Sequence, residues 1–188
     1  MTLPRLALLA AAAALFPFAA ASAHAQAIYG MLSAGHYSGL GVGPGTAGNQ
    51  SGGITARGGT FGFYESFVPF GPVKLGGDAR VIVENSANST PYGNKILGGL
   101  FGLRLGVGLP SIPVQPYVQA EIGGVGTNNG TSNSRTGSFA YQVQGGVDFT
   151  IVPHLDARGE YGAGQLTSIS GANHTLQQFG IGLVLRVF

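Results

Sequence analysis

The sequence has no cysteine and no tryptophan, and only 9% of its 188 residues are charged. The absence of cysteine excludes disulfides from the fold. An ordinary globular protein carries about 25% charged residues, so this set is too small to cover a water-exposed surface. The nine basic and seven acidic residues nearly balance, and this balance argues against a nucleic-acid partner, which would require a basic surface.

Long apolar runs are also scarce. After residue 26 no uninterrupted apolar stretch is long enough for a transmembrane helix, which needs about 20 residues. Before it, the chain has Arg5, an apolar run over residues 6–21 and an Ala-His-Ala triplet at 23–25. These features are typical of a secretory signal peptide. We therefore expect residues 1–25 to be a cleaved signal peptide and residues 26–188 to form one domain. An uncleaved anchor helix is disfavoured because the apolar run is short, and the lack of a following cysteine excludes lipoprotein processing.

The chain is rich in glycine, with 34 residues, and in segments that alternate between apolar and polar side chains. The final segment shows this best, because Phe179, Ile181 and the next three odd-numbered residues are large and apolar, whereas the even-numbered positions carry Gln178, Gly180, Gly182, Val184 and Arg186. A period of two indicates a β-strand with one apolar face. Its length of about 13 residues is sufficient to cross a bilayer at a tilt. A single strand in lipid cannot satisfy its own backbone groups, so it must belong to a closed sheet.

Eight segments of this kind divide the domain. They cover residues 27–37, 53–65, 73–84, 95–107, 114–126, 138–151, 155–166 and 176–188. The connections at 38–52, 85–94, 127–137 and 167–175 are long and polar, whereas those at 66–72, 108–113 and 152–154 are shorter and contain proline. Long extracellular loops that alternate with short periplasmic turns are typical of outer-membrane barrels. The sequence thus predicts an all-β fold, an eight-stranded antiparallel transmembrane β-barrel with periplasmic termini.

The charged residues share one face of the segments. Because apolar residues occupy the other face, we expect lipid outside and a small polar lumen. Nine charged side chains are predicted to pair inside this lumen: Asp78, Arg80, Glu84, Arg104, Glu121, Asp148, Arg158, Glu160 and Arg186. A barrel of eight strands is only wide enough to be filled by side chains. We interpret the set as a plug of ion pairs; a proton or ion path is the alternative.

Glycine pairs and aromatic residues complete the pattern. Pairs at 58–59, 76–77, 98–99, 123–124 and 145–146 would allow sharp curvature and leave room for interior arginines. Two membrane-interface girdles are predicted, one of Tyr29, Tyr64, Phe67, Phe70 and Phe149 at the turn side, the other of Tyr37, Tyr92, Phe139 and Tyr141 at the loop side. The first two segments have apolar residues on both faces, so we expect a bulge or a shifted boundary there.

The residues from Pro116 to Arg158 carry the most particular pattern, with Pro-Tyr-Val-Gln-Ala-Glu at 116–121 and Gly-Gly-Val-Asp-Phe at 145–149. With this pattern the chain resembles the small eight-stranded outer-membrane barrels of the outer-membrane-protein-A-like and -X-like group, in particular barrels of soil bacteria of the acidobacterial kind. The resemblance extends over essentially the whole domain. It implies a structural, adhesive or surface-binding role without shared catalytic residues. Phe188 would be the terminal residue read during assembly, although Arg186 replaces the aromatic residue common at the third position from the end.

Two other functions deserve comparison. His36 and Ser38 have the spacing of the His-x-Ser element of outer-membrane lipid A deacylases, in which the histidine activates the serine. No acidic residue close in sequence could orient His36, so we favour a histidine at the membrane interface. A soluble periplasmic lipocalin-like barrel would need apolar residues on the inward face, where this chain has charges.

The sequence therefore predicts a non-enzymatic, monomeric protein of the bacterial outer membrane. Its expected partners are outer-membrane lipid, lipopolysaccharide and the barrel assembly machinery. No metal site and no cofactor is predicted, because no histidines or carboxylates have the spacing of metal ligands.

Overall fold

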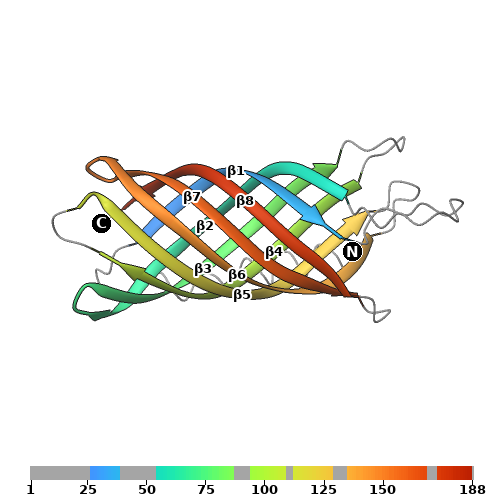
Figure 1. Cartoon of the computed structure of the whole chain (residues 1–188), viewed down its shortest axis with the longest axis horizontal. Helices are drawn as coiled ribbons and strands as arrows, with labels where there is room; N and C mark the ends of the chain where they lie inside the picture. The colour runs from blue at the N-terminus through green and yellow to red at the C-terminus, as the bar shows by residue number, and fades with distance from the viewer. Residues whose placement is uncertain are drawn as a thin grey trace, which may run out of the picture.

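Eight strands close into a barrel in the computed structural model of the chain. The structure describes residues 26–38, 54–86, 94–108, 112–128, 135–168 and 173–187. The strands are β1 (Gln26–Tyr37), β2 (Ile54–Phe70), β3 (Val73–Ser86), β4 (Asn94–Val107), β5 (Val114–Asn128), β6 (Arg135–Val152), β7 (Leu155–Ser168) and β8 (Asn173–Arg186). Each strand pairs antiparallel with the next, and β8 pairs with β1 (Figure 1). The predicted eight-stranded antiparallel barrel is confirmed.

Every strand is long enough to span a membrane. They contain between 12 residues in β1 and 18 in β6, and a tilted transmembrane strand needs about 9–11. Because β1 and β8 pair, no strand edge is left open, and the backbone groups of all eight strands can be satisfied in lipid. Within the described residues no helix is both long and apolar enough to span a membrane. The predicted signal peptide, Tyr92 and Phe188 lie outside these residues.

The prediction was least accurate in β2, which continues to Phe70 instead of ending at residue 65. The register shifts between Ser66 and Val68, so Phe67 is the extra residue of a β-bulge. This confirms the expected irregularity of the segment. The turn predicted at 66–72 is wrong, because the bulge interrupts the alternation while strand pairing continues past it. The actual turn has only two residues, Gly71 and Pro72, and Gly71 adopts a φ of 64°, which glycine allows without steric cost.

Apolar side chains cover the outside of the barrel. Leu32 is 73% exposed, and Phe61 and Leu103 are each 60% exposed. Most of the described charged residues lie inside, where Arg80 and Glu121 are each 2% exposed. This arrangement is the reverse of that in a soluble protein, and it suits a wall in contact with lipid. It also opposes the lipocalin-like alternative, whose interior would be apolar.

Two apolar clusters lie within the barrel in addition to the charges. The larger cluster is near the end that carries the longer connections and contains Tyr37, Ile54, Ala56, Ile82, Ile96, Leu100, Val125, Ala140, Leu166 and Leu176. The smaller one contains Ala27, Tyr29, Met31, Tyr64 and Val184. The sequence had suggested a uniformly polar lumen. The two clusters show that part of the lumen is apolar. The larger cluster, which we call the apolar cap, packs side chains across the lumen toward one end.

Candidate functional site: a charged network in the lumen

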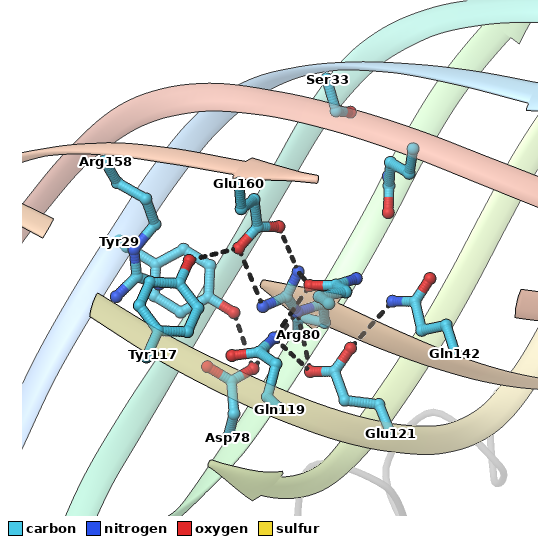
Figure 2. Close-up of polar contacts among 12 residues, drawn as sticks. Tyr29, Ser33, Asp78, Arg80, Tyr117, Gln119, Glu121, Gln142, Arg158 and Glu160 are labelled. Carbon is cyan, nitrogen blue, oxygen red and sulfur yellow. Dashed lines mark hydrogen bonds and ion pairs between the residues drawn. The ribbon is translucent and has the colours of Figure 1, made fainter. Parts of the chain in front are cut away.

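Alternation along the strands places the polar residues of the interior. Asp78 and Arg80 are two residues apart on β3, as are Gln119 and Glu121 on β5, so each pair points to the same side of the sheet. All four side chains are buried. Together with residues from β6 and β7, they form a layer of polar contacts across the lumen (Figure 2).

Arg80 is the centre of this layer. Its Nε lies 3.2 Å from Oδ1 of Asp78 and 2.9 Å from Oε1 of Glu121. Its Nη1 lies 2.5 Å from Oε1 of Glu160 and donates a hydrogen bond of 2.6 Å to Oε1 of Gln144. One guanidinium therefore binds three carboxylates that come from three strands. A buried ion is tolerable only with such partners, because its loss of hydration is costly.

A second group of ions surrounds Asp148. Arg158 donates to its Oδ1 and Oδ2 over 2.7 and 2.9 Å, and Nη2 of Arg104 lies 2.7 Å from Oδ2. Arg186 pairs with Asp156 at 2.6 Å, and its side chain is 24% exposed. Asp156 was absent from the predicted set, although it shares the inner face of β7 with Arg158 and could have been found by alternation alone.

Tyrosines join the charged groups, and sequence reasoning missed this. The hydroxyl of Tyr29 donates to Asp78 and that of Tyr117 to Glu160, each over 2.7 Å. The Cζ of Arg104 lies 3.5 Å from the ring centroid of Tyr117 and 4.1 Å from that of Tyr64. Such contacts between a cation and ring faces are stronger when the guanidinium is largely buried, as Arg104 is.

The assignment of Tyr29, Tyr64 and Tyr37 to outer girdles is therefore wrong. All three side chains are buried in the barrel, because they occupy inward positions of β1 and β2. Phe67, Phe70, Phe149, Phe139 and Tyr141 are exposed on the outside, as a girdle requires. Glycines make room for the inward rings. A Cβ atom on Gly62 would lie 2.5 Å from the hydroxyl of Tyr29, and one on Gly146 would overlap the ring of Tyr117.

Glu84 differs from the other predicted network residues. It is fully buried, yet its carboxylate accepts from three neutral groups: Ser33 Oγ at 2.7 Å, Tyr37 Oη at 2.8 Å and Gln178 Nε2 at 3.0 Å. The predicted ion pairing of Glu84 thus does not appear among the described residues. Its place near the apolar cap explains this, because the neighbouring inward residues are apolar or uncharged. The other eight predicted residues all take part in ion pairs.

Three glutamines surround Glu121 and Arg80. Nε2 of Gln119 donates to Glu121 over 3.1 Å and to Gln144 over 2.9 Å, and Nε2 of Gln142 donates to Glu121 over 2.8 Å. Alternation along β5 and β6 places all three side chains on the inner face, but the predicted network contained charged residues only. Their amides extend the Arg80 layer from β5 to β6.

The structure does not bring His36 and Ser38 together as a catalytic pair. His36 is exposed on the outer wall, and its Nδ1 lies 3.3 Å from Oγ1 of Thr55. Ser38 Oγ lies 2.6 Å from Oγ1 of Thr175 and accepts a hydrogen bond from the Thr175 amide. Each side chain is therefore held by a different threonine, and neither contact activates a serine.

At the opposite end, a small cavity opens beside Lys74, Tyr64 and Arg104. Its volume is about 30 Å³, room for about two water molecules. It cannot hold a metabolite or a lipid head group. Among the described residues, the apolar cap and the two groups of ions occupy the interior of the barrel.

An apolar outer wall, a charged and filled lumen and full closure by eight strands define a small transmembrane β-barrel of the bacterial outer-membrane type. The chain belongs to the family described as outer membrane protein beta-barrel domain, whose model matches residues 6–186. This confirms the family predicted from the sequence, and the acidobacterial kind stays a prediction. No curated protein matches the chain.

Solved structures show the same fold at low sequence identity. Neisserial surface protein A aligns with a TM-score of 0.61 and 14% identity, over 86% of this chain and 96% of that one. Ail, the attachment invasion locus protein of Yersinia pestis, aligns with a TM-score of 0.53 and 11% identity, over 88% of this chain and 99% of that one. At identities this low the similarity shows a shared fold only. The function of this chain must be inferred from its own residues.

Proposed function

We propose that this protein is a structural or surface-interaction barrel of the outer membrane, with a closed lumen and no catalytic activity. The observation that carries the proposal is the double filling of the lumen. The Arg80 layer crosses it at one level, and the apolar cap packs across it nearer one end. We expect neither layer to leave a polar path for ions, because the ions of the first pair with one another and the second is apolar. The barrel then acts through its wall and through the connections between its strands.

Planar-bilayer recordings test the closed lumen. The purified barrel should show no steady conductance of porin size. Leu100→Ser removes one large side chain from the apolar cap and should not open a channel, because the ionic layer remains. Well-defined open channels in the unmodified protein would contradict the proposal.

The proposed orientation places the longer connections outside the cell and both termini in the periplasm. It is supported by the contrast between the two-residue turn after β2 and the connection of residues 38–53 after β1, since outer-membrane barrels have short periplasmic turns. The chain contains no cysteine, so a single engineered thiol can be labelled without background. A membrane-impermeant maleimide should label Asn129→Cys in intact cells and should leave Ser111→Cys unlabelled until the cells are opened. The opposite pattern would reverse the orientation.

A lipid A deacylase is the second function that can be tested directly. Purified barrel incubated with lipid A should release no fatty acid, and His36→Ala should behave in the same way. Among the described residues Ser38 contacts no base that a third group holds, and His36 and Ser38 each contact a different threonine. Release that disappears in His36→Ala, while the folded barrel is retained, would replace the structural function by an enzymatic one.

A further inference from the structure

Three polar side chains lie next to one another on the outer wall, near the strand ends that carry the longer connections. Asn85 of β3 is the register partner of Arg57 on β2 and also of Lys95 on β4. All three are exposed, and they alternate with the buried residues Ala56 and Glu84. Neighbouring strands are about 4.8 Å apart, so the backbones of the two cations are roughly 10 Å apart. Both long side chains can therefore reach a single group placed above Asn85.

This row marks the edge of the apolar wall. Two residues further along the strands, the next outward row consists of Leu32, Gly59, Val83 and Leu97, which are paired in register. Leu32 and Val83 are 73% and 44% exposed. On β2 and β4, a cation therefore lies about 7 Å along the strand from the last row of the apolar wall. In a transmembrane barrel this change occurs where the hydrocarbon meets the head groups.

The chain supplies no carboxylate for Arg57 and Lys95. Six of its seven acidic side chains are buried in the barrel: Asp78, Glu84, Glu121, Asp148, Asp156 and Glu160. The seventh, Glu65, is eight residues from Arg57 along β2, a distance of about 27 Å in an extended strand. The segments 39–53, 87–93, 129–134 and 169–172, which connect strands at this end, contain no acidic residue. An anion that neutralises the two cations must come from the surroundings.

We propose that Arg57, Asn85 and Lys95 form a binding site on the barrel wall for the phosphate groups of lipid A in the outer leaflet. The planar guanidinium of Arg57 can bind a phosphate through two parallel hydrogen bonds, and Lys95 adds a point charge. The amide of Asn85 is a neutral donor between them. The acyl chains of the same lipid would lie on the apolar row below. The inference rests on the orientation proposed above, because it requires this end of the barrel to face the outer leaflet.

The site can be tested with the full folded protein in neutral detergent micelles, titrated with lipid A that carries both phosphates. Each cation close to an anionic lipid surface contributes about fivefold to affinity, so Arg57→Gln/Lys95→Gln should bind roughly 25-fold more weakly. Arg57→Lys/Lys95→Arg keeps both charges and should stay within a few fold of the original affinity. Lys74→Gln is the matched control, since Lys74 is an exposed cation at the other end, and should bind normally. The mobility of unboiled protein on a gel verifies that each variant is folded.

The outcomes separate this inference from the proposed function. Lipid A without phosphates should bind weakly and equally to the original protein and to the double Gln variant. Equal affinity of these two proteins for the phosphorylated lipid would overturn the site, as would an equal loss in Lys74→Gln. Phosphatidylglycerol that binds as tightly as lipid A would overturn the choice of lipid. Micelle binding does not depend on orientation in the cell, so a reversed maleimide pattern refutes the topology while leaving the binding result interpretable.

Discussion

Replacing Arg80 by leucine should strongly destabilise the barrel. The side chains of Arg80, Asp78 and Glu121 have no exposed surface, and Glu160 completes the set of three carboxylates around the guanidinium. Removing one partner of a buried ion pair costs about 3–5 kcal/mol, because the remaining charge stays buried without compensation. Here three carboxylates lose the same partner, so we expect a loss at the upper end of this range in the free energy of unfolding.

Urea unfolding in liposomes can measure this loss, with the folded fraction read from the gel mobility of unboiled samples. Lys74→Gln removes a cation that is exposed at the mouth of the lumen and should leave the stability nearly unchanged. Adding Glu121→Gln and Glu160→Gln to Arg80→Leu should recover much of the loss, because neutral amides do not require a cation. A loss below about 1 kcal/mol in Arg80→Leu, or no recovery in the triple variant, would refute the view that Arg80 compensates the carboxylates.

Two further predictions concern packing and closure. Gly146→Ala places a Cβ atom on the ring of Tyr117 and should cost about 1–3 kcal/mol in urea unfolding, whereas Gly159→Ala meets no atom within 4 Å and should be neutral; equal stability of the two variants would contradict the role of Gly146. Deleting residues 183–188 removes the partners of β1 from Ala27 to Gly30 and leaves backbone groups unpaired in lipid, each at a cost of several kcal/mol. The truncated chain should therefore be missing from the outer-membrane fraction, and normal insertion would show that β8 does not close the barrel.

Alternation along single strands was sufficient to predict the barrel and the position of its charges. In β3 and β7 all charged residues occupy even-numbered positions, so one face is defined without knowledge of any neighbouring strand. β1 offers no such signal, because small residues such as Gly30 and Ala34 occupy its outer face. Tyr29 points into the lumen, where its hydroxyl donates to Asp78, a residue 49 positions away in the sequence. Contacts of this kind are set by register between strands and cannot be read from one segment.

The apolar cap was missed for a related reason. Ile82 and Leu100 lie on the same faces as Arg80 and Arg104, and a face that carries charges had been taken to be polar throughout. In the structure, these faces are polar over one part of the lumen and apolar toward the longer connections. Strand β2 posed a different problem, since the bulge at Phe67 shifts the alternation by one residue.

A nitroxide scan along β4 tests most directly that apolar residues face lipid while the lumen is sealed from it. The chain has no cysteine, so single labels can be placed at Leu97, Phe101 and Leu103 outside and at Ile96 and Leu100 inside. The outward residues are 36%, 59% and 60% exposed and the inward residues are 1% and 2% exposed. In liposomes the outward labels should collide frequently with oxygen dissolved in the bilayer, and the inward labels should be immobilised and protected. Collision rates without this alternation, or with the inward labels more accessible to oxygen, would contradict the account.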